Sequence, residues 1–173
     1  SPAALATSSS PLTAPDVSGF FGNAVTNAGD VNGDGYADVI VGARDYSSSL
    51  GRAYIYYGSA SGLATSPATT LTGENAGDMF GYCVTSAGDL NGDGYDDVVV
   101  IHDRNALVLH GAPTGIAPQL ATEIVPAEEH AYGWRVAGAG DVNRDGFDDL
   151  VGALKSDWEE AIFVFLGGPT GIA

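Results

Sequence analysis

The chain has 173 residues, 45% of them hydrophobic, and its 22 acidic residues outnumber 6 basic ones, which gives a net charge of −16. This charge argues against nucleic-acid binding, because nucleic acids are bound by basic surfaces. No apolar run approaches the roughly 20 residues that span a bilayer, so we expect no membrane insertion.

The first eleven residues differ from the rest. Ser, Ala, Thr and Pro dominate them, and we interpret residues 1–11 as a flexible linker or tail. Residues 12–19 precede the first aromatic–glycine pair and occupy the place of a short strand.

A motif then occurs three times. Each copy has an aromatic–glycine pair and, eight positions after the glycine, the first Asp of a nine-residue acidic loop. The copies are Phe21-Gly22 with 30–38, Phe80-Gly81 with 89–97, and Tyr132-Gly133 with 141–149. Spacings of 59 and 52 residues between the loops indicate a repeat protein.

Each repeat continues with short β-forming runs separated by turns. An apolar run follows every acidic loop, then a variable loop, a second run and a Gly-rich turn; a further strand is expected before the next aromatic–glycine pair, at 68–72 and 121–125. Four antiparallel strands per repeat predict an all-β fold of β-propeller blades. We divide the chain into blades at 12–63, 64–116 and 117–173.

These motifs resemble those of FG-GAP repeat proteins, whose best-known members are the propeller domains of integrin α subunits. The FG element is clear in the first two repeats and altered in the third, and the GAP element is degenerate, as in Gly42-Ala43-Arg44. The resemblance implies propeller blades, calcium in the loops between their first two strands, and extracellular adhesion or ligand recognition.

The acidic loops can also be read from their chemistry. Ca²⁺ takes six to eight oxygen ligands, and side chains at positions 1, 3 and 5 of a tight loop converge on one ion. Position 6 is Gly in every copy, position 7 offers a backbone carbonyl, and position 9 offers another carboxylate. We predict three Ca²⁺ sites with these ligands: Asp30, Asn32, Asp34, Tyr36 and Asp38; Asp89, Asn91, Asp93, Tyr95 and Asp97; Asp141, Asn143, Asp145, Phe147 and Asp149.

Other metals fit the loops less well. Mg²⁺ prefers a stricter octahedral shell with several waters, and Zn²⁺ prefers Cys or His ligands, which the loops lack. In the third loop Arg144 replaces the position-4 glycine, and we expect its charge to weaken that site.

The edge of the blades opposite the acidic loops is the expected place for a partner. Candidate ligand-binding residues there are Arg44, Tyr46, Arg104, Lys155 and Trp158. The three basic residues recur at similar places in the repeats, and the two aromatic residues offer rings for a protein or glycan. The alternative is ordinary surface solvation with pairing to neighbouring aspartates.

No catalytic motif is present, so we predict that the segment is not an enzyme. The favoured function is calcium-dependent recognition of a protein or glycan ligand, outside the cell or at its surface. Two alternatives stay open: a purely structural calcium-stabilised module, and an accessory domain of an extracellular hydrolase or lyase.

Three blades do not close a propeller, which has 4–8 blades. Either the chain is a fragment of a longer propeller, or two copies form a six-bladed homodimer in which residues 12–19 complete the last blade of the neighbouring chain.

Overall fold

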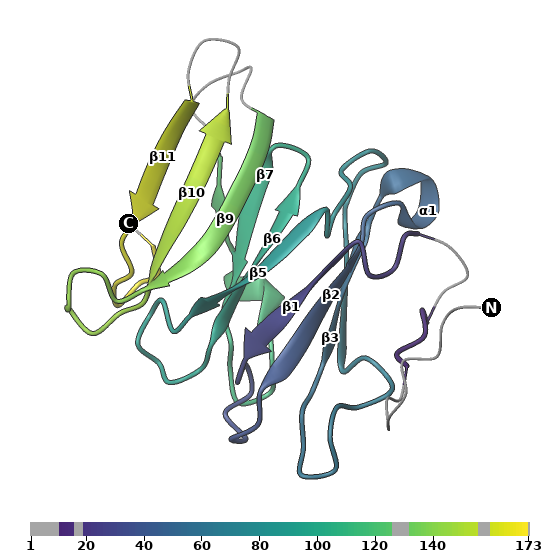
Figure 1. Cartoon of the computed structure of the whole chain (residues 1–173), viewed down its shortest axis with the longest axis horizontal. Helices are drawn as coiled ribbons and strands as arrows, with labels where there is room; N and C mark the ends of the chain where they lie inside the picture. Colours follow the sequence, from purple (N-terminus) through teal and green to yellow (C-terminus); the bar gives the residue numbers. More distant parts are fainter. Residues whose placement is uncertain (1–10, 16–18, 126–131, 156–159, 173) are drawn as a thin grey trace, which may run out of the picture.

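The computed structural model describes residues 11–15, 19–125, 132–155 and 160–172 as three antiparallel sheets that lie side by side (Figure 1). The first sheet contains β1 (Ala24–Gly29), β2 (Asp38–Ala43), β3 (Arg52–Tyr56) and β4 (Thr69–Thr72). The second contains β5 (Cys83–Gly88), β6 (Asp97–His102), β7 (Asn105–Leu109) and β8 (Thr122–Ile124). The third contains β9 (Tyr132–Gly140), β10 (Asp149–Lys155) and β11 (Glu160–Phe165).

Strand periodicity decides which side chains meet between the sheets. In the first sheet Ile40 of β2 pairs with Ile55 of β3, and both side chains are buried toward the second sheet. The next residues along these strands point to the other face, because side chains alternate along a strand. The first strands β1, β5 and β9 contact one another in sequence, which is the arrangement of neighbouring propeller blades.

Two apolar cores hold the three sheets together. The core between the first and second sheets includes Ile40, Ile55, Phe80, Val98 and Val100. The core between the second and third sheets includes Leu90, Val99, Ile101, Val108 and Leu150. The second sheet is therefore covered on both faces, which explains why β6 is a continuous apolar run rather than an alternating one. Each fully buried side chain of this size contributes about 1.5–3 kcal/mol.

The two outer faces of the array differ. On the first sheet, Tyr54 and Tyr56 are buried in a cluster that includes Phe21 and Leu12, and the rings of Phe21 and Tyr54 meet edge to face at 5.6 Å. On the third sheet, Ile162 is 75% exposed and Val164 is 56% exposed. The array thus has one covered outer face and one open apolar face.

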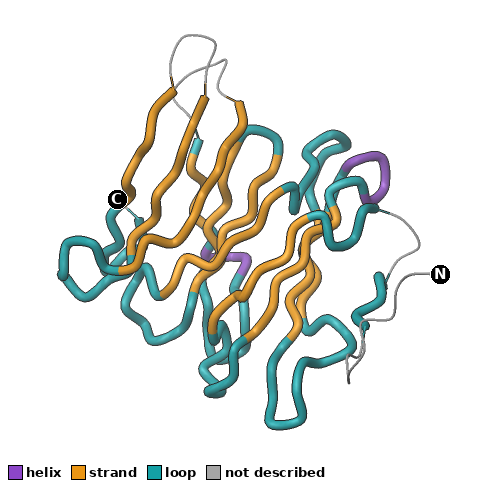
Figure 2. The backbone as a smooth tube through the Cα atoms, in the orientation of Figure 1, coloured by secondary structure: helices purple, strands orange, loops and turns teal. Residues whose placement is uncertain are grey.

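The three sheets are consistent with propeller blades, and the fourth strands expected at 68–72 and 121–125 are β4 and β8, whereas the described part of the third sheet has three strands. The sheets are offset from the sequence units by one strand, since β4 precedes the second FG pair yet pairs with β3. Two short turns were not expected from the sequence: α1 (Tyr46–Ser49), in which Ser47 and Ser48 have non-helical φ/ψ, and a 3₁₀ turn at Pro118–Leu120. Figure 2 shows that the loops lie at both ends of the strands. In the described residues no helix is long and apolar enough to cross a membrane.

Candidate functional site: three acidic loops

The three acidic loops lie at one edge of the array. They connect β1 to β2, β5 to β6 and β9 to β10, and all three lie at the lower ends of the strands in Figure 1. The same local sequence therefore produces the same turn in three blades.

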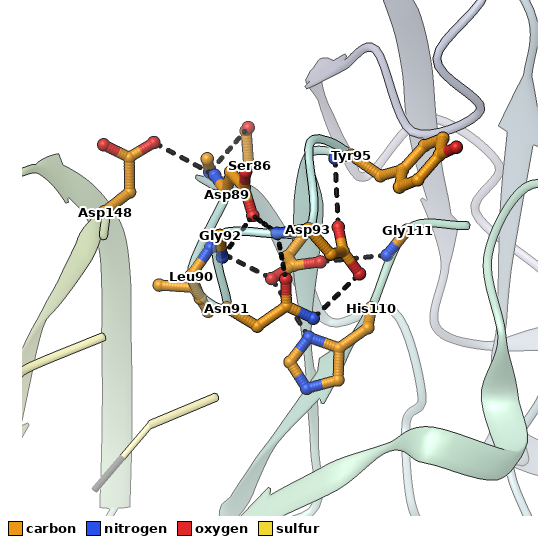
Figure 3. Close-up of polar contacts among 12 residues, drawn as sticks. Ser86, Asp89, Leu90, Asn91, Gly92, Asp93, Tyr95, His110, Gly111 and Asp148 are labelled. Atoms are coloured by element: carbon orange, nitrogen blue, oxygen red, sulfur yellow. Dashed lines mark hydrogen bonds and ion pairs between the residues drawn. The ribbon is translucent and has the colours of Figure 1, made fainter. Parts of the chain in front are cut away.

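Hydrogen bonds tie positions 1, 3 and 5 of each loop together. In the first loop the Asp30 carboxylate accepts the N–H groups of Asp34 (3.0 Å) and Gly35 (2.8 Å), and Asn32 Oδ1 also accepts from Asp34 (3.0 Å). Asp34 Oδ1 in turn accepts the N–H of Tyr36 at 2.9 Å. Equivalent bonds occur in the second and third loops. Figure 3 shows this network in the second loop.

The position-6 glycine is required by the backbone. Gly35, Gly94 and Gly146 have φ of 88°, 89° and 94°, a region that side chains disfavour. This turn directs the N–H groups of positions 5 and 6 toward the first Asp.

The position-9 aspartates lie beneath the loops and are fully buried. Asp38 accepts the N–H groups of Val31 (3.1 Å) and Gly58 (2.8 Å), so it joins the loop to the end of β3. Asp97 and Asp149 make the same pair of contacts in their own blades. Burial raises the pKa of Asp38, and the two backbone hydrogen bonds partly oppose that rise.

The second blade adds a histidine that the sequence analysis did not single out. His110 Nδ1 lies 3.0 Å from Asp97 Oδ2, and both side chains are buried. The hydrogen bond to Asp97 raises the pKa of His110, while desolvation lowers it. His110 stands where Tyr57 and Leu166 stand in the other repeats, and that difference was the only sequence signal for it.

The donor chemistry of the loops fits a hard cation. Each loop offers only oxygen ligands, and each carboxylate has about four lone-pair positions, so the hydrogen bonds leave capacity for a metal. Among the described residues, however, no three His, Cys, Asp or Glu side chains already form a metal-binding group. The structure brings positions 1, 3 and 5 together, whereas the position-9 carboxylates accept backbone N–H groups.

The predicted ligand-binding residues that the structure describes lie at the opposite edge. Arg44 pairs with Asp45 at 3.6 Å and lies over the rings of Phe20 and Tyr82. The Tyr46 ring is 3.6 Å from the guanidinium carbon of Arg52. Arg104 follows β6 and Lys155 ends β10, both exposed, whereas Trp158 lies outside the described residues. Arg44 and Tyr46 therefore have partners within the chain.

Comparison with known proteins gives the family. The model of the FG-GAP-like repeat matches residues 30–100 and 89–152. Integrin alpha-8 of Mus musculus is 30% identical over 167 residues, covering 83% of this chain and 15% of the relative. Integrin alpha-6 of Gallus gallus is 46% identical over 81 residues, covering 46% of this chain and 7% of the relative.

The chain thus spans only a small part of these relatives, from 7% to 15% of their lengths. The two matches to the repeat model include all three acidic loops. Together with the three antiparallel sheets, they show that this chain belongs to the family of FG-GAP-like repeat proteins and is similar to integrin alpha chains.

Proposed function

We propose that the three acidic loops each bind one Ca²⁺ ion and that the chain is a calcium-stabilised recognition module of the extracellular adhesion type. The observation that carries the metal proposal is the threefold recurrence of one hydrogen-bonded loop whose side-chain ligands are all oxygen atoms. Ordinary Asp/Gly turns have no reason to repeat three carboxylates and one amide at the same positions.

Electrostatics supports the same proposal. The predicted ligand positions of the loops hold nine of the 22 acidic residues of the chain. Without a cation these carboxylates repel one another, and three Ca²⁺ ions add six positive charges against a net charge of −16. Folding and metal binding are therefore coupled in our account.

The proposed adhesion function rests on the similarity to integrin alpha chains. Calcium loops suit calcium-rich surroundings, which favours a secreted or cell-surface location. We place partner recognition, for a protein or glycan, at the edge opposite the calcium loops, where Arg104 and Lys155 are exposed. We assign no catalytic role to the segment.

Binding to immobilised matrix proteins and glycans tests the recognition proposal. We expect at least one matrix component to bind the calcium-loaded chain. This binding should be lost when calcium is chelated, and it should also be lost in the Arg104→Ala, Lys155→Ala double variant. A matched control is Arg144→Ala, which removes one positive charge at the loop edge. If no matrix component binds above the level seen with the heat-denatured chain, the adhesion proposal is wrong.

The open face of the third sheet leads to a proposal about assembly. Ile162 and Val164 present an apolar surface of the kind that a neighbouring blade covers elsewhere in this chain. We propose that a second copy covers it. Formation of a head-to-tail ring also requires Leu12 to move from the outer face of the first sheet, where it packs with Phe21, Val41 and the buried tyrosines.

Light scattering in calcium checks this assembly. We expect twice the chain mass for the wild type and the chain mass for Val164→Glu. A wild-type monomer would contradict the dimer and leave the face for a further blade of a longer protein.

A further inference from the structure

At each junction between blades, a carboxylate of one repeat accepts a hydrogen bond from the acidic loop of the preceding repeat. Asp96, at position 8 of the second loop, accepts the N–H of Asp30 at 2.7 Å. Asp148, at the same position of the third loop, accepts the N–H of Asp89 at 3.0 Å, as Figure 3 shows. The backbone reciprocates, because Asp96 donates its N–H to the carbonyl of Asp30 (3.2 Å) and Asp148 donates to that of Asp89 (3.0 Å). The first ligand of each of these loops is thus held by the next blade.

The preceding loops are shaped to receive these groups. A side chain on Gly29 would overlap the Asp96 carboxylate, and one on Gly88 would overlap that of Asp148. The position-7 ring of the next blade covers the position-4 glycine: a Cβ on Gly33 would lie 2.6 Å from the Tyr95 ring. Phe147 covers Gly92 in the same way. The glycines at loops 1 and 2 therefore leave space for the side chains of the next blade.

The third loop, which has no following blade in this chain, shows what the junction does. The position-2 residues Val31 and Leu90 are fully buried in loops 1 and 2, but Val142 is 56% exposed in loop 3. Among the described residues, no neighbouring atom lies within 4 Å of a Cβ placed on Gly140, the counterpart of Gly29. Position 4 is Arg144 instead of glycine.

The first repeat differs from the other two at position 8 of its loop. Its position-8 residue is Ala37, which is exposed, so the first blade offers no carboxylate to a preceding loop. Position 8 is Asp in the second and third repeats, and both carboxylates contact the preceding loop.

We propose that Asp96 and Asp148 are positioning residues that hold the calcium loop of the preceding blade, so that loops 1 and 2 bind Ca²⁺ more tightly than loop 3. This inference rests on the proposed calcium binding. The crossing carboxylate fixes the backbone of the first ligand before the metal arrives, and it adds one negative charge beside the loop. Calcium binding to loops 1 and 2 is then coupled to docking of the next blade.

A titration with CaCl₂ followed by amide NMR tests the proposal, because Gly35, Gly94 and Gly146 report the three loops separately. Outer-shell partners of metal ligands typically change metal affinity 10–100-fold when removed. We expect Asp96→Ala to weaken loop 1 by about 10-fold and to leave loop 3 unchanged, and Asp148→Ala to weaken loop 2 by about 10-fold. Asp96→Asn keeps an acceptor oxygen and loses the charge, and it should weaken loop 1 by less.

The matched control is Ala37→Asp in the Val164→Glu background, in which no second copy covers the third sheet. It adds the same carboxylate where no loop of the same chain precedes it and should change none of the three affinities. A second readout needs no metal: in chelator, the amide of Asp30 should exchange with solvent faster in Asp96→Ala than in the wild type. A merely structural role for Asp96 would lower the melting temperature without changing the relative affinities of the loops.

The outcomes separate the two proposals. Wild-type loops that show no calcium response would overturn the proposed function. If the wild-type loops bind calcium but Asp96→Ala weakens loop 2 alone, or weakens all three loops equally, the proposed function stands. Only the proposal that Asp96 holds the preceding loop would then be overturned.

Discussion

Replacement of Asp97 by alanine should lower the free energy of unfolding by about 3–5 kcal/mol, because it leaves several buried hydrogen-bonding groups without their acceptor, at about 1–3 kcal/mol for each. Asp97 is fully buried and accepts the N–H groups of Leu90 and Gly111 as well as the contact from His110. All of these groups stay buried in the variant and lose their acceptor. The measurement is urea unfolding in the presence of chelator, so that loss of a metal ligand does not contribute.

Asp45→Ala is the control for this experiment, because Asp45 lies near the surface and pairs with Arg44, which is also partly exposed. Pairs of this kind contribute about 0–1 kcal/mol. Asp38→Ala should fall between the two, since Asp38 has the same two backbone bonds as Asp97 and no histidine. Equal stability of Asp97→Ala and Asp45→Ala would show that the buried carboxylates do not hold the loops to the sheets.

Two substitutions at position 4, glycine to arginine in the second loop and arginine to glycine in the third, should have opposite effects on the free energy of unfolding. Gly92→Arg is expected to cost about 2–4 kcal/mol: a side chain at its φ of 72° costs about 1–2 kcal/mol, and the Phe147 ring must also move. Arg144→Gly should be neutral or stabilise the chain by about 1 kcal/mol, because Arg144 already has a φ of 62° and is exposed.

Thermal unfolding of the two variants in chelator checks this prediction, with Gly33→Arg as a second copy of the destabilising change. Gly33 has the same φ of 72° and lies under the Tyr95 ring. A similar loss of stability in Arg144→Gly and Gly92→Arg would mean that position 4 has the same environment in all three loops, contrary to the structure.

Much of the fold could be predicted from the repeat. The runs after each acidic loop became β2, β6 and β10, because β-branched residues between two Gly-rich turns have few alternatives to a strand. The fourth strands were expected at 68–72 and 121–125 and are β4 and β8. Their sheet could not be read from sequence order, since a strand beside the next repeat can pair with either blade, and β4 pairs with β3.

The candidate site was predictable only in part. The spacing of Asp30, Asn32 and Asp34 implies a tight turn, and their hydrogen bonds confirm that they lie together. Whether the loops bind calcium stays a prediction. The burial of Asp38 beneath the loop depends on Gly58, twenty residues away, and could not be inferred from local sequence.

The contacts of the junction residues could not be predicted from local sequence for a similar reason. Asp96 and Asp97 are neighbours in one acidic loop, but their carboxylates contact different blades. Only the packing of β5 beside β1 brings Asp96 to Asp30, 66 residues earlier in the chain. The substitution of Ala37 at the same position was a visible signal, but its meaning required the neighbouring blade.

Calorimetric titration of the purified chain with CaCl₂, after chelator has been removed, tests the central claim most directly. Our account predicts three bound ions per chain, with two tighter sites and one weaker site, and a melting temperature that rises on binding. When the free Ca²⁺ concentration is 100 times the dissociation constant of a site, binding at that site adds about 2.7 kcal/mol to the free energy of unfolding. A chain that binds no calcium, and melts at the same temperature in calcium and in chelator, would contradict the account.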